Sequence, residues 1–336
     1  MNSTGTRYLW ITALIIAVAL VSFPRFDLQD MGPIIEYTGK IDGEQSFGDA
    51  VFYMSYVEYF RGEGPIEDVH LPFRYRPLIP FIASLLPIES PMTAINVVNL
   101  VALYATVLFL LMFLRSLGFD SRFSILGCFL YVVSFPVFYM STTGCLDACI
   151  MCMLTIGAYL MFKEKWLLLA ITIAVGVPIK EVIVLLIPVA VAYLWVTGSS
   201  HSKLLWTSLL LLLAFVIPTV LIKMVFIRSG DFYWVPSVST LLDNLRVRAM
   251  LSLLLSFGLP GILSILFVVR YRKLAGFIQK RTLVPLLTGV VVTVLLVVYS
   301  MLTAYTDGRF IWPMTIFTIP MALWVIRYKP FRSQIA

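Results

Sequence analysis

The residues best suited to chemistry gather in one polar stretch near the start of the chain, residues 42–80. This stretch, DGEQSFGDAVFYMSYVEYFRGEGPIEDVHLPFRYRPLIP, mixes carboxylates, arginines and tyrosines in an otherwise apolar sequence. A positioned carboxylate can act as a general base towards a hydroxyl group. Arginine presents planar donors that engage two phosphate oxygens at once. We therefore expect any catalytic carboxylate of this protein to lie in this stretch.

Asp49 is the first candidate for that base. Residues 49–60, DAVFYMSYVEYF, are typical of a helix, with Asp49, Tyr53, Tyr56 and Phe60 on one face. An aromatic stripe beside a polar edge favours a helix lying on a membrane surface, with Asp49 facing a groove beside it. The sequence from Ser46 to Asp49 also fits a capping box, so the carboxylate has a second interpretation as an acceptor for amides at the helix start.

Arg74 and Arg76 stand in the segment PFRYRPLIP, residues 72–80, where the chain turns back towards apolar sequence. An arginine at this boundary is suited to holding a lipid phosphate. The alternative is an ordinary interfacial anchor whose charged end reaches the lipid headgroups. Both interpretations place these arginines at the membrane interface.

Five further ionisable residues interrupt or border apolar segments: Asp147, Lys180, Glu181, Asp307 and Arg309. Ionisable groups at or within a membrane are costly unless they are paired, and they often mark a site. Each residue alone is also interpretable as a helix cap or a structural ion pair. The expected topology places all five at the same membrane level as Asp49, and this convergence favours a shared site.

The elements that must position these residues are apolar helices. The chain has 336 residues, of which 60% are hydrophobic and 13% charged, and its mean hydropathy is +0.95. Apolar runs of about 20 residues predict membrane helices. We expect an all-α polytopic protein whose single domain, residues 1–336, has about ten transmembrane helices. The predicted spans are 8–22, 92–114, 123–140, 147–162, 166–178, 182–196, 204–227, 249–269, 282–303 and 311–326. The pair 166–178 and 182–196 is short, and its other interpretation is one unit broken around Pro178 and Lys180.

The first loop, residues 24–76, is expected to carry juxtamembrane helices. Residues 77–88 are too short to span and predict an interfacial or re-entrant piece. The segment 270–281, RYRKLAGFIQKR, has five basic and no acidic residues, and such segments stay in the cytoplasm. We therefore expect a multi-pass membrane protein with both termini cytoplasmic and the 24–76 loop outside. The membrane is expected to be a prokaryotic plasma membrane.

Other kinds of site have little support in the sequence. His70 and His201 are far apart, and Cys145, Cys149 and Cys152 have helical spacing that suits buried membrane cysteines better than a metal site. A Gly-rich phosphate loop, H-E-x-x-H and G-x-S-x-G are all absent. The net charge of +7 is accounted for by basic helix ends, so we expect no nucleic-acid partner.

The order of these features resembles the GT-C glycosyltransferases, membrane enzymes that use polyprenyl-phosphate-linked sugars. A first span is followed by an outer loop with Asp49 four residues before Tyr53, and then by a YRPLIP-type re-entry. An aspartate then opens an outer helix end, a Lys-Glu pair interrupts an apolar segment, and D-x-R-x-x-x-P precedes the last span. The paired acids of many members are absent at Asp49, which leaves Asp42 and Glu44 as rivals for the base.

The resemblance implies inverting sugar transfer with Asp49 as the base. It implies donor-phosphate binding by the positive residues Arg74, Arg76, Lys180 and Arg309. It implies contacts with the sugar or acceptor from Tyr53, Asp147, Glu181 and Asp307. The partners would be a lipid-linked sugar donor, a glycan, lipid or protein acceptor, and membrane lipids. No residue is assigned to a metal, and the cofactor stays open, because some members use a divalent metal and others none.

Two other classes of function compete with this interpretation. A transporter or a flippase of lipid-linked glycans usually has paired repeats and charges near the membrane midplane. We find no internal repeat, and the charges are expected at the outer edge. A membrane scaffold that docks partners on its outer loop is the third class, and it would tolerate Asp49→Asn.

Overall fold

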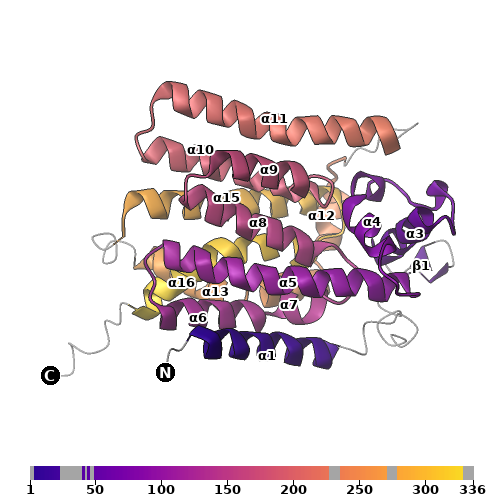
Figure 1. Ribbon diagram of the computed structural model, residues 1–336, viewed down its shortest axis with the longest axis horizontal. Coiled ribbons are helices and arrows are strands. Elements are labelled where there is room, and N and C mark those ends of the chain that lie inside the picture. The colour runs from indigo at the N-terminus through magenta and orange to yellow at the C-terminus, as the bar shows by residue number, and fades with distance from the viewer. Residues whose placement is uncertain are drawn as a thin grey trace.

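The computed structural model describes residues 4–22, 40–41, 44–45, 49–226, 235–270 and 278–327 (Figure 1). Within these ranges the protein is almost entirely helical, which confirms the predicted all-α class. The exception is a short antiparallel pair of strands, β1 (Lys40–Ile41) and β2 (Glu44–Gln45). The other elements described between residues 49 and 90 are α3 (Asp49–Arg61), the 3-10 turns η3 (Ile66–Asp68) and η4 (Phe73–Tyr75), and α4 (Leu78–Ser84).

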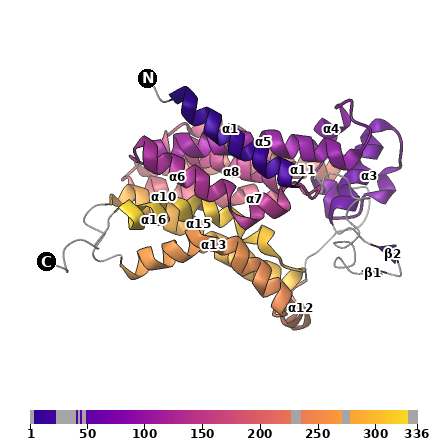
Figure 2. The ribbon, with the colours of Figure 1, turned by 90° about the horizontal axis from the view of Figure 1, so that it is seen from below.

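The remaining helices run side by side in a bundle, with α3 and α4 gathered at one of its ends (Figures 1 and 2). The bundle is built from α1 (Thr4–Ser22), α5 (Pro91–Ser116), α6 (Ser121–Val132), α7 (Phe135–Met140), α8 (Asp147–Phe162), α9 (Trp166–Gly176), η5 (Glu181–Leu185), α10 (Leu186–Val196), α11 (His201–Phe226), α12 (Val238–Asn244), α13 (Val247–Val269), α15 (Lys280–Thr303), η7 (Gly308–Phe310), η8 (Trp312–Met314) and α16 (Thr315–Arg327). The start of α1 and the end of α16 lie at the end of the bundle opposite α3 and α4 (Figure 1).

Five of the described helices are long and apolar enough to cross a membrane: α5, α11, α13, α15 and the stretch Gly308–Arg327. The other five apolar helices are shorter, and they are 5–21, 121–132, 147–162, 166–176 and 181–196. A 12-residue helix is about 18 Å long, well short of a hydrocarbon core of about 30 Å. The expectation of about ten transmembrane helices is therefore met in part: five described helices are long enough to span, and five apolar helices are shorter.

The predicted span 123–140 is wrong as a single helix, because it is divided into α6 and α7. Ser134 has extended backbone and Pro136 stands in the first turn of α7, where it lacks the amide that a continuous helix would need. The predicted break near Lys180 is present, since α9 ends at Gly176 and Lys180 has extended backbone before η5. The break at Lys180 interrupts the helix at one of the charged residues described below.

The helix predicted at residues 49–60 is present as α3, but its aromatic stripe faces the protein rather than a membrane surface. Tyr53 and Tyr56 are 1% and 0% exposed. Tyr53 packs edge-on against Phe73 with ring centroids 5.4 Å apart. The stripe is covered because α3 packs on α4 and α5, so its rings fill an interface between helices.

Candidate functional site

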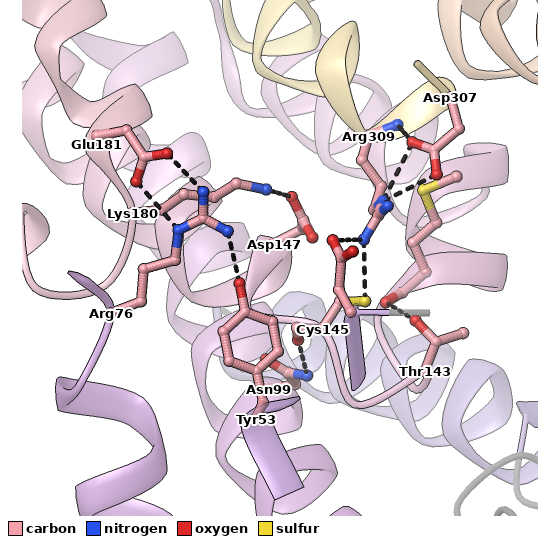
Figure 3. A network of polar contacts seen from close by, with 12 residues as sticks. Tyr53, Arg76, Asn99, Thr143, Cys145, Asp147, Lys180, Glu181, Asp307 and Arg309 are labelled. Carbon is pink, nitrogen blue, oxygen red and sulfur yellow. Dashed lines mark hydrogen bonds and ion pairs between the residues drawn. The ribbon is translucent and has the colours of Figure 1, made fainter. Parts of the chain in front are cut away.

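Charged residues from five separate segments meet at the end of the bundle near α3 and α4 (Figure 3). The segments are the start of α3, the residue after η4, the start of α8, the break before η5, and the turn before α16. They contribute Asp49, Arg76, Asp147, the Lys180–Glu181 pair, and the Asp307–Arg309 pair. The structure thus brings together eight of the nine residues proposed from the sequence, Tyr53 among them.

Arg309 joins the first loop to the last helix. Its Nη1 atom donates to Oδ2 of Asp49 at 2.8 Å, across 260 residues of sequence. Its Nε atom donates to Oδ2 of Asp307 at 2.9 Å. Nη1 also lies 3.2 Å from Sγ of Cys145. The guanidinium is therefore held between two carboxylates, which fixes the direction in which Asp49 points.

Lys180 and Asp147 form a buried ion pair. Nζ of Lys180 donates to Oδ1 of Asp147 at 2.6 Å, and the two residues are only 9% and 3% exposed. The ammonium also lies 6.0 Å from the centre of the Phe310 ring. Because the pair is largely excluded from water, removal of one residue would leave the charge of the other buried without a partner.

Arg76 is bound to Glu181 through two hydrogen bonds, from Nε to Oε2 at 3.0 Å and from Nη2 to Oε1 at 2.5 Å. Its third donor, Nη1, reaches the hydroxyl oxygen of Tyr53 at 2.6 Å. In the view of Figure 3 the Lys180–Asp147 pair lies between this group and Arg309. Tyr53 thus acts as a positioning residue for Arg76.

The charges of this network do not cancel. Three cations (Arg76, Lys180, Arg309) face four carboxylates (Asp49, Asp147, Glu181, Asp307), which leaves one negative charge when all are ionised. Every cation of the network is already paired with a carboxylate. An anionic ligand must therefore displace a carboxylate from one of these cations, or it must bind together with a further cation.

Two asparagines that sequence reasoning missed hold the loop before Asp147. Nδ2 of Asn99 donates to the carbonyl oxygen of Cys145 at 2.7 Å, and Oδ1 of Asn96 accepts from the Gly144 amide at 3.0 Å. Both asparagines are 0% exposed. The sequence does contain a signal for them: the apolar segment AINVVNL has two asparagines about one helical turn apart. Buried side-chain amides must be hydrogen-bonded, so such a pair indicates polar partners inside the bundle.

Arg74 does not join the network. Its Nε atom donates to the carbonyl oxygen of Val69 at 2.5 Å, so its guanidinium supports its own loop. Asp42 and the side chain of Glu44 in β2, the two rivals for the base, lie outside the described part of the structure. Among the residues proposed from the sequence for phosphate, Arg76, Lys180 and Arg309 are the ones that meet.

The prediction that Cys145, Cys149 and Cys152 share one helix is wrong. Cys145 precedes α8, so only Cys149 and Cys152 lie on that helix. Sγ of Cys149 donates to Oδ1 of Asn99 at 3.3 Å. Within the ranges described, no group of three His, Cys, Asp or Glu residues is arranged to hold a metal ion.

The space beside the network is small. A cavity of about 10 Å³ is lined by Asp147, Lys180 and Arg309 together with Phe310 and Trp312. This volume is about that of one water molecule and is too small for a sugar. Asp49 does not line this cavity, so the groove expected beside its side chain stays a prediction.

The environment keeps Asp49 ionised. Burial raises its pKa, but the positive charge and hydrogen bond of Arg309 outweigh burial, with help from the charges of Lys180 and Arg76. The pKa of Asp49 consequently lies below its ordinary value of 3.8. Only Oδ2 takes part in hydrogen bonds from described residues, and the side chain is 33% exposed, so Oδ1 is left to accept a further donor.

This lowered pKa predicts how Asp49 contributes to stability as pH changes. A carboxylate whose pKa is lower in the folded state stabilises that state fully above its ordinary pKa and loses the contribution as pH falls through the lowered value. We expect the difference in Tm between the wild type and Asp49→Asn to stay constant from about pH 8 to about pH 5 and to shrink only below about pH 4. Thermal unfolding in detergent measures it, and a change confined to pH 5–7 would contradict the ion pair.

Gly308 sets the position of Arg309. Its amide donates to Oγ of Ser252 at 3.0 Å. A Cβ atom at this residue would collide with Oγ of Ser256 and lie 2.8 Å from the carbonyl oxygen of Ser252. We expect Gly308→Ala to destabilise the protein by about 1–3 kcal/mol, measured as a lower Tm. Gly64→Ala is the control, because its nearest new neighbour, Cβ of Glu58, is 3.7 Å away; an equal loss in both variants would refute the steric explanation.

Comparison with known proteins gives no further assignment: no family model, no curated protein and no solved structure matches this chain.

Proposed function

We propose that this protein is a membrane glycosyltransferase. It would transfer a sugar from a polyprenyl-phosphate-linked donor to a hydroxyl group of a glycan, lipid or protein acceptor on the extracytoplasmic side. The observation that carries the proposal is the contact of Asp49 with Arg309 in a network that also holds Lys180 and Arg76. A base and several cations in one place suit the two ends of this reaction, the attacking hydroxyl and the leaving phosphate.

In the proposed reaction the acceptor oxygen forms a bond to the anomeric carbon as the bond from that carbon to the phosphate oxygen breaks. The electron pair of the broken bond stays on the phosphate, where cations stabilise the charge. The acceptor proton passes to Oδ1 of Asp49, the oxygen that has no hydrogen bond from the described residues. The sugar is attacked on the face opposite the leaving group, so its configuration is inverted.

The low pKa of Asp49 is compatible with this role. A weakly basic carboxylate is a poor base towards an ordinary hydroxyl group. Glycosyl transfer passes through a transition state with oxocarbenium character, in which the bond to the leaving group is largely broken. The acceptor hydroxyl then becomes acidic as it bonds to the electron-poor carbon, and a weak base suffices. Arg309 therefore supports catalysis by holding Asp49 ionised and oriented.

Binding of the donor must open the network. Lys180 and Arg309 line the small cavity, and each is already paired with a carboxylate. A donor phosphate that replaces Asp307 at Arg309 would free a carboxylate for the hydroxyl groups of the sugar. Asp147, which is paired with Lys180, and Glu181, which is paired with Arg76, would take this role after a similar exchange. The extended backbone at Lys180 and the turn at Asp307 are the segments that would move.

We further propose that the ten apolar helices make ten passes of a prokaryotic plasma membrane, with both termini cytoplasmic. The described start of α1 and end of α16 lie opposite α3 and α4 (Figure 1), which supports this arrangement. It places the charged network on the side where lipid-linked sugars are used.

The test is sugar transfer by the purified protein in proteoliposomes. We expect radiolabelled sugar to pass from a polyprenyl-phosphate donor to an acceptor, and we expect a nucleotide sugar to be inactive as donor. The same vesicles report flippase activity, as a change in the exposure of labelled lipid to a reagent that cannot cross the membrane. Lipid translocation without transfer would favour the flippase, and neither activity with a range of donors and acceptors would favour a scaffold.

A further inference from the structure

Lys223 stands out on the surface of α11. The helix presents large apolar side chains to its surroundings, among them Val220, Leu221 and Met224, which are 41%, 55% and 73% exposed. Lys223 is exposed among them in the last turn. Lys203 precedes it by 20 residues, or about 30 Å of helix, which matches the thickness of a hydrocarbon core. The two lysines therefore have the spacing expected of residues at the two interfaces of a membrane.

The end of α11 that carries Lys223 lies against the loop that supplies Arg76. Nζ of Lys223 is 5.7 Å from the centre of the Tyr75 ring. Phe226 contacts Tyr56 and Phe60 of α3, with ring centroids 6.1 and 6.4 Å apart. Figure 1 shows this end of α11 beside α4. Lys223 is thus an exposed cation beside the segment that carries Arg76.

The two lysines of α11 differ in their partners. Lys203 pairs with Glu164 at 3.3 Å, and its ammonium also lies 6.0 Å from the Trp166 ring. For Lys223 no carboxylate of the described residues lies within ion-pair distance. An ammonium group has three N–H donors, and one aromatic ring does not satisfy them. Lys223 is therefore equipped to hold an anion from the lipid side.

The charge balance of the buried network explains why phosphate binding would need a further cation such as Lys223. Its three cations are committed to four carboxylates, so the network offers no free positive charge to an arriving phosphate. Lys223 has no such partner within the described ranges. Lys223 contacts Tyr75, and Arg76 is the next residue in the chain. The exposed Lys223 and the buried Arg76 therefore lie beside the same short segment.

We propose that Lys223 and Tyr75 form a docking site for the phosphate of a polyprenyl-linked lipid, through which the donor approaches Arg76 from the membrane. This inference rests on the proposed function, because it names where the donor of that reaction first binds. Lys223 supplies the positive charge, and Tyr75 orients its ammonium group. The polyprenyl chain would lie along the exposed apolar face of α11.

Lipid binding tests the proposal without the reaction. The full-length protein is placed in neutral phosphatidylcholine nanodiscs that contain a photo-crosslinkable polyprenyl phosphate, and labelling is measured against its mole fraction. We expect Lys223→Gln to weaken binding roughly five- to tenfold, the size of one interfacial charge, and Lys223→Arg to restore it. Lys203→Gln is the matched control on the same helix and should bind like the wild type.

Two results would overturn the docking site. One is unchanged labelling of Lys223→Gln that unfolds at the wild-type temperature. The other is competition by phosphatidylglycerol as effective as that by unlabelled polyprenyl phosphate, because an ordinary interfacial anchor binds any anionic headgroup. Either result assigns Lys223 to anchoring.

Kinetics separate this inference from the proposed function. Since Lys223 does not reach the reacting atoms, Lys223→Gln should raise KM for the lipid-linked donor roughly five- to tenfold with kcat unchanged. Transfer that depends on Asp49 but is indifferent to Lys223 would refute the docking site alone. Binding that depends on Lys223 in a protein without transfer activity would refute the glycosyltransferase and leave the lipid site.

Discussion

Asp49→Asn is expected to lower the turnover of sugar transfer by about 10²- to 10⁴-fold, the usual contribution of a general base. Asparagine has nearly the same shape, and its amide oxygen can still accept from Arg309, but it cannot take a proton. The side chain is 33% exposed, so the change should cost about 1 kcal/mol or less in stability. Turnover and Tm measured on the same preparation separate the two effects.

Asp243→Asn is the matched control for this prediction. Asp243 of α12 also pairs with an arginine, Arg246 just before α13, at 2.5 Å, but this pair is exposed and its members are three residues apart in sequence. We expect its turnover to equal that of the wild type. If Asp49→Asn also kept wild-type turnover, Asp49 would not be the base, and Asp42→Asn and Glu44→Gln would be the next variants to measure.

Lys180→Met should be the most destabilising of the single changes in the network. It leaves the carboxylate of Asp147 buried without its partner, and breaking a buried ion pair costs about 3–5 kcal/mol. The double variant Lys180→Met, Asp147→Leu removes both charges and should recover most of the lost stability. Thermal unfolding of Lys180→Met, Asp147→Leu and the double variant completes this double-mutant cycle.

The double variant also distinguishes a structural pair from a functional one. If Lys180 contacts the donor phosphate, the recovered fold should still lack transfer activity. Lys203→Met is the control, because its pair with Glu164 is exposed and its loss should leave both stability and turnover near the wild type. A stable double variant with wild-type turnover would show that Lys180 and Asp147 only support the fold.

The sequence by itself determined the class of the fold and the segments that matter. Apolar composition predicted helices, the spacing at residues 49–60 predicted α3, and the Lys-Glu pair predicted the break between α9 and η5. These features depend on local hydropathy and backbone preference, which a single sequence contains. The same information did not reveal that the predicted span 123–140 is divided into α6 and α7.

Only the tertiary structure decided which charges are partners. Lys180 and Glu181 are adjacent, yet Lys180 pairs with Asp147, 33 residues away, and Glu181 with Arg76, 105 residues away. Lys180 has φ −166° and ψ 134°, and extended backbone directs consecutive side chains to opposite sides. Arg74 and Arg76 diverge likewise, towards Val69 in the loop and towards Glu181 in the bundle. Ion pairs act over a few ångströms, so their choice depends on how distant helices pack, which residue spacing along one chain does not encode.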